Sequence, residues 1–157
     1  MTLPSGTNLK RGRAYNIRVV LEAIRLYAPI ARTDIARRTA LSAQAISKIV
    51  THLMEDGFLV EVGKRQNGPG PPSINLDINA NRAYAVGIDV GRDHLTAVLA
   101  NLKGEVAESR HVEVEYPAPK QALAWMGETV DDLVAAAGIS RDRLCGAGVG
   151  VPGPLDT

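Results

Sequence analysis

Cysteine is almost absent from this chain of 157 residues, which contains only Cys145. A single thiol excludes an internal disulfide and any zinc site built from several cysteines. The three histidines, His52, His94 and His111, lie far apart and lack the spacing of metal ligands. We therefore expect no metal ion and no other cofactor in this portion of the protein.

The sequence also lacks a long apolar stretch. No run approaches the roughly 20 apolar residues that a membrane-spanning helix needs. The first residues, MTLPSGTNLKRGRAYN, are basic but contain no apolar core, so they do not resemble a secretory signal. The sequence therefore predicts a cytoplasmic protein with no membrane partner.

Charge is nearly balanced in total, with a net charge of +1, but it is unevenly distributed. Residues 1–80 hold 11 Lys and Arg against 6 Asp and Glu, a net charge of +5. Residues 81–157 hold 7 against 11, a net charge of −4. A basic half before an acidic half suggests a polyanion partner for the first half only, although a solvated basic surface gives the same totals.

The first half begins with a pattern typical of helices. Apolar residues recur at helical spacing from about 13 to 28, after a polar arm over residues 1–12. Pro29 is expected to end this helix, because the residue before a proline is biased out of helical geometry. Thr33 is a candidate N-terminal cap for a short second helix over residues 34–39.

A third helix and a hairpin complete the first half. Ser42 is the candidate cap of this helix, which carries an apolar stripe on one side and ends near Gly57. Residues 58–62 and 73–77 predict two short strands around the turn-rich segment 63–72. Two consecutive helices joined by a tight turn and followed by a two-stranded wing predict a winged helix-turn-helix over residues 1–80.

Such a motif binds DNA by placing its second helix in the major groove. The polar face of the third predicted helix suits that role, because Gln44 can pair with adenine while Ser47 and Lys48 reach bases or phosphates. Arg37 and Arg38 lie where phosphates are expected to pass. The candidate DNA contacts lie on the outer side of the second and third helices or at the opening of the wing loop; they are Arg37, Arg38, Ser42, Gln44, Ser47, Lys48, Thr51, Lys64 and Arg65.

The segment 13-RAYNIRVVLEAIRLYAPIARTDIARRTALSAQAISKIVTHLMEDGFLVEVG-63 resembles the N-terminal domain of ROK-family transcriptional regulators (repressor, open reading frame, kinase). Many relatives have glycine in the bend where this chain has Ala40, a replacement that a slightly different turn could accommodate. Their wing usually carries an arginine that enters the minor groove, whereas 70-GPP-72 places Pro71 there. The resemblance then implies that Lys64 or Arg65 reads the minor groove.

The second half alternates strands with one helix. Its last predicted strand runs into the glycine- and proline-rich segment 150-GVPGPLDT-157. The predicted strands cover residues of about 83–90, 94–101, 105–114 and 144–151, and the predicted helix covers about 119–137, with Gly138 as its cap. Four strands and one helix are expected to leave one face of the sheet poorly covered.

The stretch 85-AVGIDVGRDHLTAVLANLKGEV-106 resembles the phosphate-binding hairpin of sugar kinases and actin-like ATPases. Asp89 and Gly91 match, but the ROK kinases continue with glycine and threonine where this chain has Arg92 and Asp93. The bulk of Arg92 and the charge of Asp93 oppose the close approach of a phosphate to the backbone. We therefore interpret Asp89 and Gly91 as a vestigial phosphate loop, with no catalytic residue and no enzyme activity.

The family resemblance implies an α+β chain in two parts. A winged helix-turn-helix precedes the partial first lobe of an actin-like, ribonuclease H-like α/β domain over residues 81–157. In the family the catalytic Asp, the sugar-binding Glu/His motif and the zinc ligands occur in later segments. The loop 148-GVGVPGPLD-156 resembles the motif beside the sugar cleft, which makes Gly153, Pro154 and Asp156 candidate effector contacts, although the same residues also suit a plain structural turn.

These observations predict a sequence-specific transcriptional regulator, a repressor of carbohydrate-metabolism genes that responds to a sugar or sugar phosphate. Its partners would be double-stranded operator DNA, the effector and, in a full-length protein, further copies of itself. Two alternatives stay open. One is a ROK sugar kinase that phosphorylates hexoses with ATP and carries an N-terminal extension. The other is a winged-helix module that binds protein instead of DNA.

Overall fold

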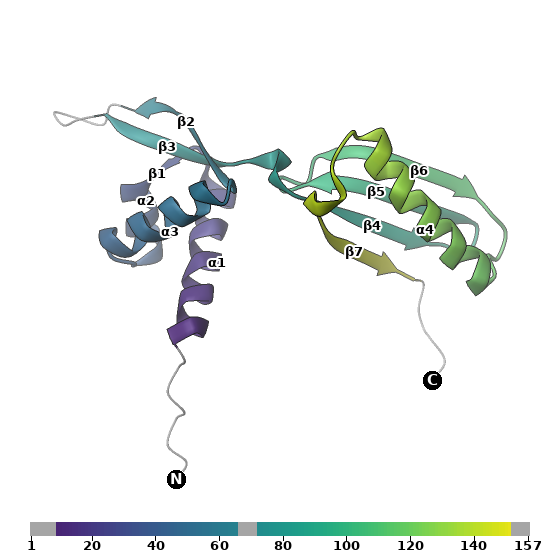
Figure 1. Ribbon diagram of the computed structural model, residues 1–157. Helices are drawn as coiled ribbons and strands as arrows, with labels where there is room; N and C mark the ends of the chain where they lie inside the picture. Colours follow the sequence, from purple (N-terminus) through teal and green to yellow (C-terminus); the bar gives the residue numbers. More distant parts are fainter. Residues whose placement is uncertain (1–8, 66–71, 152–157) are drawn as a thin grey trace, which may run out of the picture. The chain divides into compact units, whose positions relative to one another are not determined.

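The computed structural model describes residues 9–65 and 72–151 (Figure 1). The chain divides into two compact units, Met1–Asn79 and Ala80–Thr157, and each has its own hydrophobic core. Both units combine helices with an antiparallel or mixed sheet, which confirms the mixed α+β class. Within the described ranges, no helix is long and apolar enough to cross a bilayer.

The first unit is built on three helices, α1 (Leu9–Tyr27), α2 (Arg32–Thr39) and α3 (Ala43–Glu55). The α1 helix begins before the predicted residue 13, so part of the expected polar arm is helical. The expected cap at Thr33 is wrong, because α2 begins at Arg32 and has no side-chain cap. The reason is a two-residue strand, β1 (Ile30–Ala31), which holds the chain extended until immediately before this helix.

The α3 helix begins and ends as its sequence predicts. Ser42 Oγ accepts a hydrogen bond from the backbone N–H of Ala45 at 3.2 Å, which satisfies one of the unpaired donors of the first turn. Gly57 follows the helix at a φ of 76°, a conformation that glycine adopts at little cost. The apolar stripe is buried against α1, α2 and the sheet; it consists of Ile46, Ile49, Val50 and Leu53.

The turn between α2 and α3 is made by an alanine in left-handed geometry. Ala40 has φ 55° and ψ 19°, so this alanine adopts the left-handed conformation that glycine favours. The Thr39 hydroxyl supports this bend by donating to the carbonyl of Ile35 at 2.8 Å and accepting from the N–H of Leu41 at 3.4 Å.

A three-stranded antiparallel sheet with the order β1-β3-β2 closes the first unit. Strands β2 (Leu59–Arg65) and β3 (Ser73–Ile78) form the hairpin that the sequence predicts, whereas β1 was not predicted. The register shifts between Glu61 and Lys64, and Gly63 lies in that interval at a φ of 116°. Because of this bulge, β2 continues to Arg65, so Lys64 and Arg65 extend the strand instead of opening the loop as expected.

The second unit contains a four-stranded sheet with the order β6-β5-β4-β7. Strand β7 runs parallel to β4, and the other neighbours are antiparallel. Each predicted element is present within about two residues. The elements are β4 (Tyr84–Val90), β5 (His94–Asn101), β6 (Val106–Glu113), α4 (Pro119–Ala136) and β7 (Leu144–Gly150), with short 3-10 turns at Ala80–Arg82 and Arg141–Arg143.

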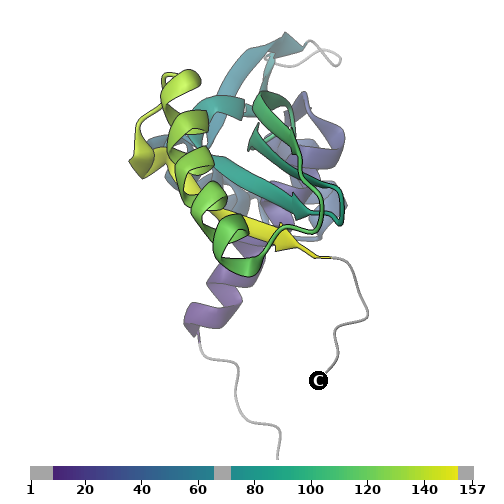
Figure 2. The ribbon, with the colours of Figure 1, turned by 90° about the vertical axis from the view of Figure 1, so that its right-hand side faces the viewer.

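Helix α4 lies along one face of this sheet (Figure 2). The residues between them form the core of the unit, in which Leu133 of α4 packs against Tyr84, Val86 and Leu99. Alternate residues of β4, including Gly87 and Asp89, face the opposite side and are exposed. No described element of this unit covers that face, as the count of strands and helices predicts.

Candidate functional site

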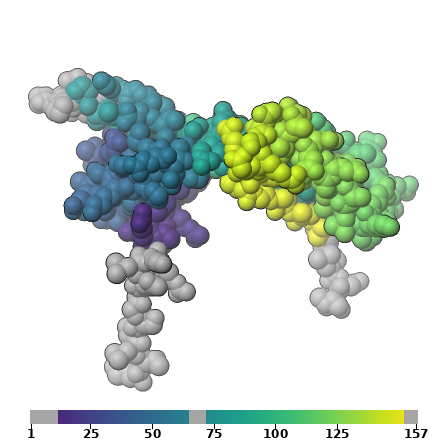
Figure 3. Space-filling view, in the orientation of Figure 1, coloured from purple at the N-terminus to yellow at the C-terminus, as the bar shows by residue number. Residues whose placement is uncertain are grey.

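The outer face of α3, opposite the buried apolar stripe, carries a row of polar side chains. Gln44, Ser47, Lys48 and Thr51 are all exposed. Residues of α2 and α3, blue in the space-filling view, lie on the face of the first unit shown in Figure 3. The structure therefore brings these four predicted contacts onto one accessible helix surface.

The two arginines of α2 are held by different partners. Arg37 pairs with Asp34 one turn earlier, at 3.1 Å between Nη2 and Oδ1, while its side chain stays 78% exposed. Arg38 stacks its guanidinium over the ring of Tyr27, with Cζ 3.8 Å from the ring centroid. Both remain accessible to a polyanion, but Asp34 partly offsets the charge of Arg37, which makes Arg38 the stronger candidate phosphate contact.

The remaining candidates on this unit have distinct positions. Ser42 uses its side-chain oxygen to cap α3, so only its hydroxyl hydrogen is left to donate to a partner. Lys64 is exposed near the end of β2. The side chain of Arg65 and the wing segment 66–71, with Pro71, lie outside the described residues.

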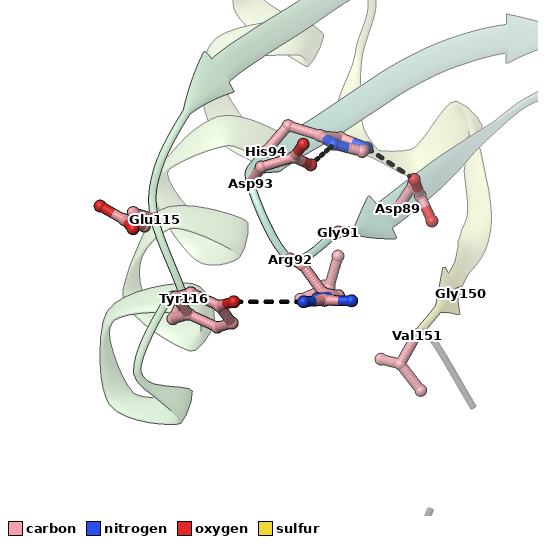
Figure 4. A pocket seen from close by; sticks show the side chains of 10 residues that line it. Asp89, Gly91, Arg92, Asp93, His94, Glu115, Tyr116, Gly150 and Val151 are labelled. Atoms are coloured by element: carbon pink, nitrogen blue, oxygen red, sulfur yellow. Dashed lines mark hydrogen bonds and ion pairs between the residues drawn. The ribbon is translucent and has the colours of Figure 1, made fainter. Parts of the chain in front are cut away.

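A pocket of about 630 Å³ lies at one end of the sheet of the second unit (Figure 4). It forms where the parallel strands β4 and β7 both reach their carboxyl ends, the usual place for ligands in such sheets. Asp89 and Gly91 border it from β4, and Gly150 and Val151 border it from the end of β7. The two predicted loop residues, Asp89 and Gly91, therefore line a real pocket.

The His94 ring occupies the space beside Gly91. Its ring nitrogens bond to carboxylates on both sides, with Nδ1 2.7 Å from Asp93 Oδ1 and Nε2 3.0 Å from Asp89 Oδ2. The ring lies so close to the backbone that a Cβ at position 91 would be 2.6 Å from Nδ1. The glycine is thus used for packing an imidazole and is not open to an anion.

Arg92 also lines the pocket, where its Nη2 donates to the hydroxyl of Tyr116 at 3.1 Å (Figure 4). Sequence reasoning missed both His94 and Tyr116. The signal that could have indicated His94 is its position across the predicted hairpin turn from Gly91. In the structure the two residues lie opposite each other, and the N–H of Gly91 donates to the carbonyl of His94 at 2.8 Å.

The electrostatics of this cluster favour a protonated imidazole. The hydrogen bonds with Asp93 and then Asp89 raise the pKa of His94 above its ordinary value of 6.5. The same bond to His94 lowers the pKa of Asp93. One imidazolium between two carboxylates leaves a net negative charge, which repels a phosphate. Among the described residues, no group of His, Cys, Asp or Glu is arranged to hold a metal ion.

The candidate effector residues Gly153, Pro154 and Asp156 lie outside the described residues. The strand that leads to them ends beside the pocket, because a Cβ at Gly150 would be 3.5 Å from Asp89 Oδ1. The contact of these three residues with an effector stays a prediction.

Comparison with known proteins supports a single family. The sequence profile of the ROK family matches residues 85–157. A xylose repressor of Bacillus spizizenii is 28% identical over 141 residues, covering 90% of this chain and 37% of the repressor. The DNA-binding transcriptional dual regulator NagC of Escherichia coli is 26% identical over 153 residues, covering 95% of this chain and 37% of NagC.

A solved structure agrees with the fold. The crystal structure of a ROK family transcriptional regulator, a homolog of the E. coli MLC protein, superposes with a TM-score of 0.67 at 22% identity. The superposition covers 90% of this chain and 36% of that one. The chain therefore spans a little over a third of the length of the regulators that it matches.

Proposed function

We propose that the chain belongs to the ROK family, whose sequence profile matches residues 85–157, and that it is the DNA-binding portion of a transcriptional repressor that responds to a sugar or sugar phosphate. Similarity to two transcriptional regulators over nine-tenths of the chain or more supports this proposal. In it, the first unit holds operator DNA and the second belongs to the effector-sensing domain.

In this proposal the first unit is a winged helix-turn-helix. Helices α2 and α3, joined by the Ala40 turn, would form the helix-turn-helix, and the β2–β3 hairpin would be the wing. Helix α3 would enter the major groove, with Gln44 against base edges and Arg38 on a phosphate. The observation that carries the proposal is the exposed polar row of α3 opposite its fully buried apolar stripe.

The second unit would be the first lobe of an actin-like domain that has given up phosphate binding. Its support is the His94 ring over Gly91, in the position where kinases bring a nucleotide phosphate to the backbone. The effector would bind in the complete domain near the 148–156 loop and shift the balance between domain arrangements of different DNA affinity. Two-fold dimers reading paired half-sites fit this scheme.

The proposed DNA binding is tested with duplexes that tile the region upstream of the chain's own gene, across a salt series. We expect sequence-specific binding that weakens steeply as salt rises, because phosphate contacts release counterions. Gln44→Ala should change the preferred bases, whereas Arg38→Ala should weaken binding to all duplexes by a similar factor. An absence of binding even at low salt contradicts the proposal and favours a protein-binding module.

The enzymatic alternative has its own test. Incubation of the full-length protein with ATP and several hexoses, including glucose and N-acetylglucosamine, should give no phosphorylated sugar. The same sugars, together with xylose and the hexose phosphates, are then added to the complex with DNA, and one of them should change the affinity. Phosphoryl transfer well above a protein-free control would instead support a kinase.

A further inference from the structure

A shallow hollow on the first unit lies between the start of α1 and the outer face of α3. Its volume is about 390 Å³. One lining residue comes from α1 and the others from successive turns of α3; they are Arg13, Ser47, Lys48, Thr51, His52 and Glu55. The hollow thus joins the polar row of α3 to a cation from a helix that the sequence pattern had not connected with DNA.

The side chains of this hollow are suited to a phosphate group. Arg13 and Lys48 are exposed and make no ion pair with any of the described residues, unlike Arg25 of the same α1 helix, which bonds to Glu22. Ser47 and Thr51 add hydroxyl donors to the same lining. Two cations and two hydroxyls are the side-chain types that most often contact DNA phosphates.

The acidic residue at the far end limits where an anion can lie. Glu55 follows Thr51 by one turn of α3, in the last turn of the helix, where the helix dipole is also unfavourable for anions. His52 is turned toward Asp56, with Nε2 3.6 Å from Oδ2. An anion in the hollow therefore lies nearer Ser47 and Lys48 than Glu55.

We propose that this hollow holds a backbone phosphate of DNA and that Arg13 is a DNA contact supplied by α1. The inference rests on the proposed function, and it adds a residue that positions the protein without reading bases. Because Arg13 approaches α3 from a different helix, its contact would fix the depth and tilt of α3 in the groove.

The test compares three variants of the chain in DNA binding across a salt series, with a random-sequence duplex beside the upstream duplexes. Arg13→Ala should reduce the slope of log affinity against log salt by about 0.9, the loss of one phosphate contact. Arg18→Ala is the matched control, because residues five apart do not share a helix face and Arg18 is also exposed. Its slope should equal that of the unsubstituted chain.

The third variant gives a change of opposite sign. Glu55→Gln removes the only carboxylate among the described residues that line the hollow and should strengthen binding to both duplexes. If the unsubstituted chain binds DNA but Arg13→Ala and Arg18→Ala have the same slope, the inference is overturned and the proposed function stands. If the unsubstituted chain binds no duplex, both are overturned. If Arg13→Ala lost binding to an acidic polypeptide but kept its binding to DNA, that result would also contradict the phosphate assignment.

Discussion

Two small residues of this chain show that local geometry and close packing make separate demands. Ala40 adopts the left-handed conformation that usually selects glycine, although it carries a Cβ. Gly91 has no such backbone angle, yet it cannot be replaced without contact, because the His94 ring lies against it. The first residue bears conformational strain, and the second makes room for a side chain.

Replacing Ala40 by glycine should stabilise the first unit. A left-handed residue with a Cβ is strained by roughly 1–2 kcal/mol, and glycine removes that strain at some cost in chain entropy. We expect the free energy of unfolding to rise by about 0.5–1 kcal/mol. Urea denaturation followed by circular dichroism measures the change.

The same chemical replacement inside a helix is the control for this prediction. Ala14 is exposed within α1, and Ala14→Gly should lower the free energy of unfolding by about 0.5–1 kcal/mol. If the free energy of unfolding changed with the same sign in both variants, the turn at position 40 would not be strained.

The protonation of His94 should depend on its carboxylate neighbours. Because its pKa is raised, the ion pairs contribute fully at pH values below 6.5 and are lost as the pH rises through the folded-state pKa. The contribution of Asp93, whose pKa is lowered, is lost only as the pH falls through that lowered value. The cluster is therefore fully formed between these limits.

An NMR titration of the imidazole resonances tests this. The midpoint of His94 should lie above 6.5 and should fall toward it in Asp93→Asn. The Asp131→Asn variant, which removes a carboxylate bonded to Arg141 instead, should leave the midpoint unchanged. A His94 midpoint at or below 6.5 in the unsubstituted chain would contradict the geometry of the cluster.

Gly91→Ala should displace the His94 ring while leaving the hairpin folded. The added methyl group would overlap the imidazole, so the ring must turn away and lose its bonds to Asp89 and Asp93. We expect the His94 midpoint to fall as it does in Asp93→Asn. Gly127→Ala is the control, because a Cβ there meets no atom within 4 Å, and it should not affect the titration.

At the scale of the element, the proposed function requires α3 to be stable and to present a binding surface with the same few residues. Its apolar stripe and its ends were readable from the sequence because caps and helical spacing are local properties. Its surroundings were not. The β1 strand, the shift of the α2 start, and the stacking of Arg38 on Tyr27 arise from contacts between distant residues. The same holds for Arg13, which only the fold brings beside Lys48.

The capping role of Ser42 and its proposed DNA contact can be separated by substitution. Ser42→Ala removes the cap and should lower the free energy of unfolding by about 1 kcal/mol. Ser42→Asp keeps a capping oxygen and suits the helix dipole, so stability should be retained, but its negative charge should weaken DNA binding. Stability is measured by urea denaturation and affinity by fluorescence anisotropy. Equal DNA affinity in Ser42→Asp and the unsubstituted chain would place this position away from the phosphates.

At the scale of the whole molecule, charge and packing divide the chain at nearly the same place. The basic half and the acidic half of the sequence correspond closely to the two compact units, and each unit encloses its own core. This division was readable from composition and periodicity. The side-chain cluster around His94 was not, because its members are assembled by the hairpin register and not by a motif.

Separate cores predict separate responses to core damage. Leu133 is fully buried in the second unit, and Leu133→Ala should destabilise that unit by about 2–5 kcal/mol. DNA binding should be unchanged at a temperature where the first unit remains folded. The counterpart Ile35→Ala, in the first core, should instead abolish binding on unfolding. A loss of binding in both variants would show that the first unit depends on the second.

The bulge at Gly63 determines on which face of the β2–β3 hairpin the residues after it lie. In a strand the side chains alternate between two faces, and one additional residue in a bulge reverses the face on which each following side chain of that strand lies. Lys64 is paired with Ile74, whereas uninterrupted pairing from Glu61 would place it against Ser73. Ser73 and Ile74 are consecutive and face opposite sides, so uninterrupted pairing of the same sequence would carry this lysine to the other face of the hairpin. The register shift at Gly63, and not the composition of the strand, decides on which face of the β2–β3 hairpin the charge of Lys64 lies.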